Sequence, residues 1–155
     1  MAASGFNLTN PSAFIGEEIG VSSWVTLDQA TIDMFARCTG DHQWIHVDVE
    51  RAKRESPFGA TVAHGYLTLS LIANATFELL IRPAGVKQAF NYGLERVRFI
   101  APVKAGARVR DRIKVISIEG KGGGRFLVTT ENTFEIEGET KPALTAVALA
   151  MLVAD

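Results

Sequence analysis

The sequence contains one cysteine, Cys38, and no linker, repeat or low-complexity segment among its 155 residues. A single cysteine cannot form a disulfide within the chain, so the apolar core alone must stabilise the fold. Cys38 lies within a predicted helix, where we expect a buried and unreactive thiol and no nucleophile. The absence of an internal boundary predicts one domain over residues 1–155.

An excess of charge of one sign is also absent. The 16 basic residues nearly match the 17 acidic ones, for a net charge of −1, which excludes a chain that coats nucleic acid. The first twenty residues lack a basic stretch leading into an apolar run, and no window has enough uninterrupted apolar residues to span a bilayer. We therefore expect a cytoplasmic protein with no membrane or nucleic-acid partner.

Two helices are predicted in the first third of the chain. Residues 26–40 carry apolar residues at helical spacing, and Thr26 and Gln29 stand at the spacing of a capping box. Residues 48–55 predict a shorter helix with Asp48 as its N-cap.

A longer helix and a set of strands follow. Residues 64–81 are apolar on nearly every side of a helical projection, which predicts a helix buried all round. Farther on, apolar and polar residues alternate between glycine-bearing turns, which is typical of antiparallel strands. The expected strands are 22–26, 91–103, 107–119, 125–137 and 142–154. Together these elements predict an α+β fold, in which an antiparallel sheet of about five strands curls around the long helix.

The most polar stretch, GDHQWIHVDVERAK, occupies residues 40–53. Asp41 and His46 stand five residues apart across a loop, where a carboxylate and an imidazole could hold and deprotonate one water molecule. Alternatively, Asp41 makes a turn contact at the helix exit and His46 satisfies a carbonyl. His42 and His46 also have H-x-x-x-H spacing, but no helical period runs through this stretch, so we expect no metal site. Trp44 is expected to pack under the loop.

A second candidate lies at the start of the long helix, in VAHGYLTLS. Gly65 would leave backbone N–H groups unpaired there, aligned with the positive end of the helix dipole, as in an oxyanion hole. The alternative is that Gly65 only eases the turn into the helix and His64 acts as a cap.

The stretch FARCTGDHQWIHVDVERAKRESPFGATVAHGYLTLSL resembles the hydratase signature of the MaoC-like dehydratases, which include the (R)-specific enoyl-CoA hydratases. DHQWIHVD and NYGLERVRFIAPV are most similar to the branch that contains nodulation protein N. The resemblance covers residues 15–153, and D-x-x-x-x-H combined with A-H-G is more specific than either half. It implies a single hot-dog domain that interconverts trans-2-enoyl-CoA and (R)-3-hydroxyacyl-CoA.

The resemblance also implies roles for single residues. Asp41 would exchange the proton, His46 would orient the water, the Gly65 amide would receive the thioester carbonyl, and His64 would line the substrate pocket. No cofactor is implied, because coenzyme A is part of the acyl-CoA substrate. Two alternatives are a hot-dog thioesterase, although residues 66–77 contain no carboxylate to assist hydrolysis, and a protein that binds acyl-CoA or an acyl carrier without turnover.

Basic residues gather in the second half of the chain. From Arg96 to Arg125 there are nine basic residues and two acidic ones. Four of them alternate along one predicted strand and so form a stripe on one face: Arg108, Arg110, Arg112 and Lys114. We expect the stripe to bind the phosphates of coenzyme A, with Arg96 and Arg98 as further candidates. The alternative is the solvated face of a sheet.

The last predicted strand, 142–154, is apolar on both faces. Such a strand lies in the centre of a sheet or is covered by a second subunit. Hot-dog domains tend to join their sheets edge to edge, and we therefore expect at least a homodimer.

Overall fold

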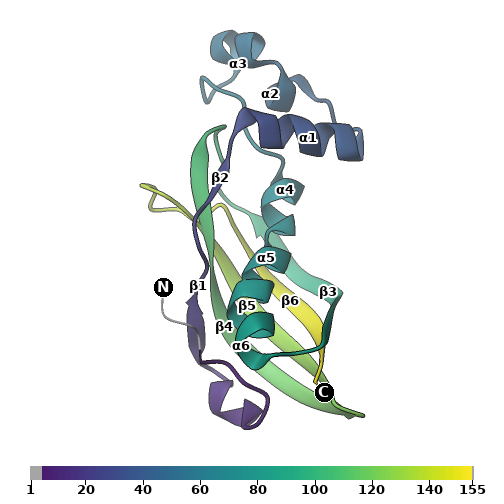
Figure 1. The fold of residues 1–155 in the computed structure, drawn as a ribbon. Coiled ribbons are helices and arrows are strands. Elements are labelled where there is room, and N and C mark those ends of the chain that lie inside the picture. The colour runs from purple at the N-terminus through teal and green to yellow at the C-terminus, as the bar shows by residue number, and fades with distance from the viewer. Residues whose placement is uncertain (1–4, 155) are drawn as a thin grey trace.

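One long helical rod packs against an antiparallel sheet of six strands in the computed structural model, which describes residues 5–154 (Figure 1). The strands lie in the order β1-β4-β5-β6-β3, and β2 also pairs with β4. Their bounds are β1 (Glu18–Val21), β2 (Val25–Leu27), β3 (Gln88–Phe99), β4 (Ala107–Gly122), β5 (Arg125–Ile136) and β6 (Leu144–Val153). The predicted α+β hot-dog class is confirmed. The sheet has one strand more than expected, because β1 was not predicted. The strand expected at residues 22–26 is present as the shorter β2.

The alternation along β5 matches its burial. Thr130, Asn132 and Phe134 are buried, whereas Glu131 between them is exposed. The turn into β5 consists of Gly123 and a second glycine after it, both with positive φ, as the tightest hairpins require. β6 lies between β5 and β3, so the prediction of a central strand with two apolar faces is confirmed.

The rod follows the predicted long helix but is not a regular α-helix throughout. Its consecutive segments are α4 (Gly65–Ser70), α5 (Ile72–Thr76), the π-helical turn η2 (Phe77–Ile81) and α6 (Arg82–Ala84). Leu71 keeps helical dihedral angles between the first two segments, so the direction of the rod is continuous in Figure 1.

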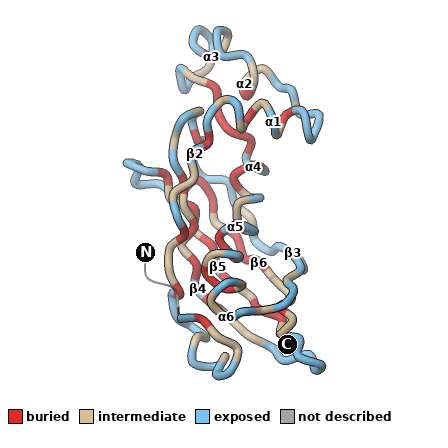
Figure 2. Tube along the Cα trace, viewed as in Figure 1, coloured by how far each residue is buried: buried red, intermediate tan, exposed pale blue. Residues whose placement is uncertain are grey.

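The prediction that this helix is buried on every side is wrong for the single chain. Tyr66 and Phe77 are 70% and 48% exposed, and the small residues Ser70 and Ala73 are exposed on the same stripe of the rod. The neighbouring edge strand β3 also exposes large apolar side chains, namely Phe90, Tyr92, Leu94 and Phe99. Figure 2 shows that most of β3 is exposed.

Three short helices lie over one end of the sheet (Figure 1). They are α1 (Gln29–Thr39), α2 (Trp44–Val47) and α3 (Val49–Glu55). The N-cap of α1 is Asp28, which accepts a hydrogen bond of 2.8 Å from the Thr31 N–H. The predicted capping box is therefore wrong, because Thr26 belongs to β2. Asp48 caps α3, as predicted.

Cys38 is exposed, so the prediction of a buried thiol is wrong. The buried face of α1 carries Ile32 and Ala36, and two residues after Ala36 the helix has turned outward. Within residues 5–154, no helix is both long enough and apolar enough to cross a membrane.

The core between the rod and the sheet consists of two apolar clusters, which a layer of buried polar residues separates. The near cluster, beside α1, includes Leu27, Ile32, Leu67, Val109 and Phe134. The far cluster includes Phe6, Ala75, Leu80, Ile113 and Val128. Along β4, Asp111 lies between Val109 and Ile113 and is paired with Phe134. Along β5, Thr130 and Asn132 lie between Phe134 and Val128 and are paired with Val115 and Ile113. Each of these three polar residues is buried.

Candidate active site

A cavity of about 660 Å³ opens beneath α1 and α2, at the start of the rod. Its walls come from five parts of the chain: α1, the loop and short helix at residues 41–46, the start of α4, residues 99–103 and residues 143–144. The cavity therefore collects Asp41, His46, His64 and Gly65, which were predicted from two separate stretches of sequence.

Asp41 lies in the loop just after α1 ends. Gly40 ends that helix with a φ of 81°, and its N–H donates to the Ala36 carbonyl. The Asp41 carboxylate accepts two hydrogen bonds of 3.3 Å from Gln43, one from its backbone N–H and one from its side chain. The turn contact considered for Asp41 is thus present. The Gln43 backbone hydrogen bond, with smaller contributions from His46 and His64, lowers the pKa of Asp41, so this carboxylate is ionised at neutral pH.

His46 is buried in α2, with 7% of its surface exposed. Its Nδ1 lies 2.7 Å from the Val62 carbonyl oxygen. Because a carbonyl can only accept, Nδ1 donates, and the neutral ring carries its free lone pair on Nε2. The carbonyl contact considered for His46 therefore exists, and it orients the ring while leaving the second nitrogen available.

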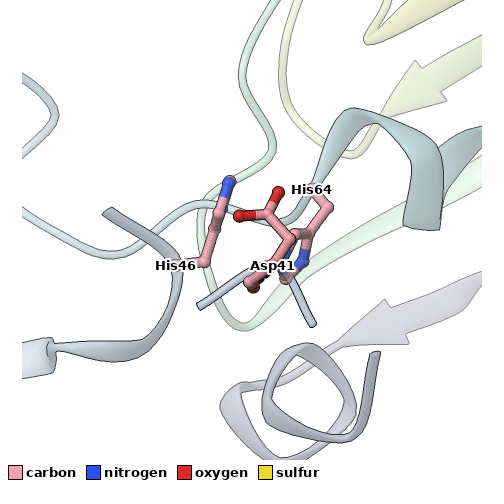
Figure 3. Close-up of side chains that lie close together, drawn as sticks. All are labelled: Asp41, His46 and His64. Carbon is pink, nitrogen blue, oxygen red and sulfur yellow. Dashed lines mark hydrogen bonds between the residues drawn. The ribbon is translucent and has the colours of Figure 1, made fainter. Parts of the chain in front are cut away.

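His64 completes a compact group with Asp41 and His46 (Figure 3). Each residue offers one atom that could bind a ligand, a ring nitrogen or a carboxylate oxygen, and these three atoms lie within 4.8 Å of one another. The two imidazole rings are stacked, with centroids 3.9 Å apart and planes inclined by 23°. Three ligand atoms this close together could hold a metal ion or a water molecule.

Gly65 is the first residue of α4, where the early N–H groups of a helix have no partner within the helix. Among the described residues, no acceptor is paired with the Gly65 N–H. The Phe99 ring lies close beside this glycine, and a Cβ at position 65 would stand only 2.8 Å from one of the ring carbons. A side chain at this position would therefore displace a wall of the cavity.

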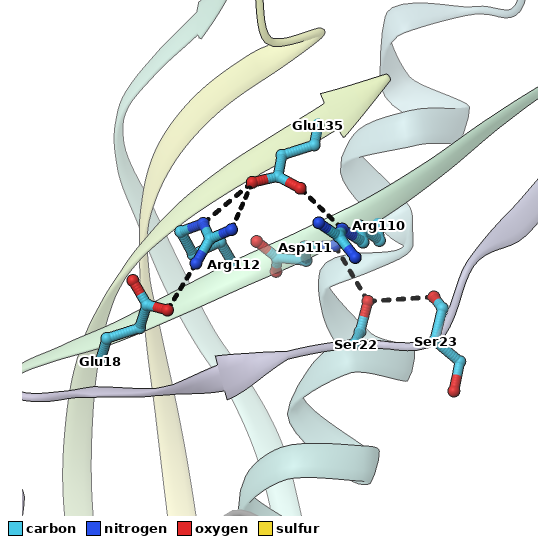
Figure 4. A network of polar contacts seen from close by, with 7 residues as sticks. All are labelled: Glu18, Ser22, Ser23, Arg110, Asp111, Arg112 and Glu135. Carbon is cyan, nitrogen blue, oxygen red and sulfur yellow. Dashed lines mark hydrogen bonds and ion pairs between the residues drawn. The ribbon is translucent and has the colours of Figure 1, made fainter. Parts of the chain in front are cut away.

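The stripe lies outside the cavity lining, and its three arginines are paired with carboxylates. Figure 4 shows the ion pairs of Arg110 and Arg112. Arg108 pairs with Glu137 at 3.1 Å, whereas Arg110 and Arg112 share Glu135 at 2.6 and 2.7 Å. Burial raises the pKa of Glu135, but the two guanidinium groups outweigh burial and hold that pKa below its usual value. These contacts favour the alternative of a solvated sheet face.

The other arginine candidates also lie outside the lining of the cavity. Arg96 has a positive φ of 47° in an irregular part of β3, and Arg98 donates to the Val97 carbonyl next to it. Arg98 directly precedes Phe99, which does line the cavity, so it stands nearer the site in sequence than the stripe.

Two side chains of the polar stretch lie apart from the compact group. His42 is exposed and does not join Asp41, His46 and His64. The half-buried Trp44 ring has the Arg51 guanidinium 4.3 Å from its centroid, so it makes a cation–π contact with α3.

Sequence reasoning missed the aromatic wall made by Tyr66 and Phe99, whose rings meet edge to face at 5.9 Å. Tyr66 directly follows Gly65, so its place beside the cavity could have been expected. The place of Phe99 could not have been expected, because its ring reaches the cavity from the end of β3, which is distant in sequence.

Comparison with known proteins gives consistent matches over most of the chain. The family model described as MaoC like domain matches residues 11–136. Nodulation protein N from Rhizobium leguminosarum bv. viciae is 49% identical over 140 residues, which are 90% of this chain and 87% of that protein. The 3-hydroxyacyl-thioester dehydratase Z from Mycobacterium tuberculosis is 46% identical over 143 residues, which are 92% and 93% of the two chains.

Solved structures show the same fold. The (R)-hydratase from A. caviae involved in PHA biosynthesis superposes with a TM-score of 0.72, over 91% of this chain and 96% of that one. Its sequence identity is 20%, so this similarity concerns the backbone arrangement alone.

Proposed function

The chain belongs to the MaoC-like domain family, and from this premise we propose that it is a hydro-lyase that interconverts trans-2-enoyl-CoA and (R)-3-hydroxyacyl-CoA. One observation carries the proposal: a carboxylate, an imidazole and a helix-start amide line one cavity, as Asp41, His46 and Gly65. These are the groups that adding water to an unsaturated thioester requires. The names of the relatives, a thioester dehydratase among them, support the reaction class.

In the proposed mechanism, one water molecule is held between the Asp41 carboxylate and His46 Nε2. The carboxylate takes a proton as the water oxygen bonds to C3 of the enoyl group. The electrons of the double bond move toward the thioester, and the Gly65 N–H stabilises the charge that develops on its oxygen. Protonated Asp41 then returns the proton to C2, so that one H and one OH have been added. Elimination follows the same steps in reverse.

The ionisation of Asp41 suits this role. A base must be unprotonated before it can accept a proton, and the hydrogen bonds from Gln43 together with the nearby imidazoles hold the pKa of this carboxyl below its usual value. The imidazole Nε2 of His46 is also free to accept a hydrogen bond from the water, since Nδ1 is engaged by Val62. The proposed reaction uses no cofactor, because coenzyme A enters as part of the substrate.

Hydrolysis of the thioester is the nearest competing reaction. The exposed and buried sides of the rod between Tyr66 and Phe77 carry no carboxylate. The next acidic residue, Glu78, accepts hydrogen bonds of 2.8 to 3.1 Å from the backbone and hydroxyl of Ser23. That carboxylate is thus committed to joining the rod to the segment before β2, and this contact favours hydration over hydrolysis.

The proposed enzyme is a homodimer. β3 is an edge strand with large apolar residues exposed, and such an edge is a template for pairing with another strand. A second cavity of about 380 Å³ lies between the exposed stripe of the rod, including Tyr66 and Ala73, and residues 91–94 of β3. A second copy placed against this edge would cover both features, and would supply the missing cover for the rod.

Incubation of the purified protein with crotonyl-CoA tests the function. Loss of the enoyl absorbance without release of free thiol, together with an (R)-3-hydroxy product on chiral analysis, is the expected result. Thiol release would instead indicate a thioesterase. If neither signal appears with short, medium and long enoyl chains, while an acyl-CoA still binds, the proposal of a catalyst is refuted in favour of a binding protein.

A further inference from the structure

One buried side chain touches both members of the proposed water-binding pair. His64 directly precedes α4 and is only 3% exposed. Its Nε2 lies 3.0 Å from the backbone carbonyl oxygen of Asp41. Since that oxygen can only accept, Nε2 carries the proton and donates it.

The backbone of Asp41 has little other support. Its N–H lies 3.4 Å from the Thr39 hydroxyl, and its side chain accepts from Gln43. Both partners are two residues away in sequence, so these contacts shape the turn without fixing the turn to the rest of the protein. The bond from His64, 23 residues farther along the chain, joins the loop to the start of the rod.

The same ring also restrains His46. With one hydrogen bond, from Nδ1 to the Val62 carbonyl, the His46 ring can still turn by small angles about its Cβ–Cγ bond. The His64 ring stacks on the His46 ring at 3.9 Å and blocks this rotation on one side. Phe35 contacts His64 with a centroid distance of 5.0 Å, so the ring that restrains His46 is itself packed.

From these contacts we infer that His64 is a positioning residue, which holds the Asp41 carboxylate and the His46 ring in the geometry that binds one water. Its hydrogen bond fixes the first residue, and its stacked face fixes the second. The inference rests on the proposed hydration and deepens it. It adds to the role implied by the family resemblance, because His64 lines the cavity while its Nε2 donor is used on Asp41.

Two substitutions separate the two contacts. His64→Phe keeps an aromatic face for His46 and Phe35 but removes the donor to Asp41. His64→Gln keeps an N–H near the position of Nε2 but removes the ring. His42→Phe is the matched control, because it changes an exposed imidazole in the same loop as Asp41.

The first measurement determines kcat and KM separately for an enoyl-CoA. Misplacing a catalytic group by a fraction of an ångström to about 1 Å lowers the rate by about tenfold to a hundredfold. We expect a loss of this size in kcat for His64→Phe and a smaller loss for His64→Gln, with KM within about twofold of wild type in both. The control should keep both constants. A rise in KM with unchanged kcat would overturn the inference, since His64 would then be contacting substrate.

The second measurement does not depend on turnover. Amide hydrogen exchange in residues 40–43 should become about fivefold faster in His64→Phe, the effect of losing one net hydrogen bond. In His64→Gln, which keeps a donor, exchange should stay near the wild-type rate. If the wild type hydrates no enoyl thioester, the proposed function fails while the exchange rates still test whether His64 holds the loop.

Circular dichroism establishes that each variant is folded. If His64→Phe does not fold, His64→Gln carries the test alone, with near-normal exchange in the loop and reduced kcat as the expected pair of results. If folded His64→Phe showed unchanged amide exchange in residues 40–43 and an unchanged kcat, the inference would be overturned. It would also be overturned if amide exchange in His64→Gln were as fast as in an unstructured loop.

Discussion

Asp111 is a buried carboxyl group whose replacement by asparagine should change how the stability of the protein depends on pH. The residue is 0% exposed, and neither carboxyl oxygen has a well-formed hydrogen bond (Figure 4). Burial raises the pKa of Asp111 to about 8, an effect that the backbone N–H of Thr133 only partly offsets. The folded protein therefore keeps this proton at neutral pH, where an unfolded chain has released it.

The sign of the effect follows from the protons bound in each state. Between the ordinary pKa of 3.8 and about 8, the unfolded chain binds fewer protons at this group than the folded one, so the free energy of unfolding falls as pH rises. The slope is about 1.4 kcal/mol per pH unit. From about pH 4.5 to about pH 7.5 wild type should lose about 4 kcal/mol through this group. Below the lower value and above the upper one, its contribution is constant.

The asparagine side chain in Asp111→Asn has nearly the same shape as aspartate and cannot ionise. The variant should therefore not show this pH-dependent fall in the free energy of unfolding. Urea unfolding at the two pH values measures the difference. The two proteins should have similar stability at the lower pH, and the variant should be more stable by about 4 kcal/mol at the higher one. Glu139→Gln removes an exposed carboxylate and serves as control. An equal difference between wild type and Asp111→Asn at both pH values would refute the reasoning, because the carboxyl group would then not hold its proton in the folded protein.

Four further outcomes can be measured. Asp41→Asn and His46→Gln should each lower kcat for hydration by at least about 10²-fold without unfolding, and the double variant should be little worse than the poorer single one, since both residues hold the same water; additive losses would argue against a shared water. Gly65→Ala should lower kcat, because the new Cβ would stand 2.8 Å from the Phe99 ring; normal kinetics would show that the ring moves freely. Light scattering should give at least a dimer at micromolar concentration, and a monomer would contradict the proposed role of β3. If coenzyme A binds to the stripe, KM should rise and kcat should hold when Arg108, Arg110 and Arg112 all become glutamine, whereas an unchanged KM would show that these arginines serve only in ion pairs.

The parts of the fold that could be predicted are long segments with a clear pattern of apolar residues. β4 and β5 alternate between apolar and polar residues, whereas β6 and the rod are long apolar runs. β1 has four residues, Glu18–Val21, and forms because β4 offers it a partner, which no local pattern reveals. The cap of α1 was misplaced for a related reason. Thr26 pairs with Arg108 in the sheet, so the helix begins after it, at the cap Asp28.

The candidate site was predictable where a motif carried it. Asp41, His46 and Gly65 come from two short stretches, and the structure brings them to one cavity. The contacts that His64 makes with the first two were not predictable, since they depend on how far two loops approach each other. For Asp111 a signal was present: if Arg110 and its alternate neighbours face outward, Asp111 must face the core. A carboxylate that is surrounded by arginines in the sequence usually lies on the surface. For this reason the burial of Asp111 was not predicted.

The polar layer at Asp111 determines how a disturbance spreads through the molecule. Apolar side chains transmit strain where they interlock, and here the interlocking is interrupted between the near and far clusters. Removing a large side chain from the far cluster, such as Leu80, costs about 2–5 kcal/mol of stability, yet the walls of the cavity that holds Asp41 and His46 belong to the other side of the layer. We therefore expect such a change to lower the fraction of folded molecules more than it lowers the kcat of the molecules that remain folded.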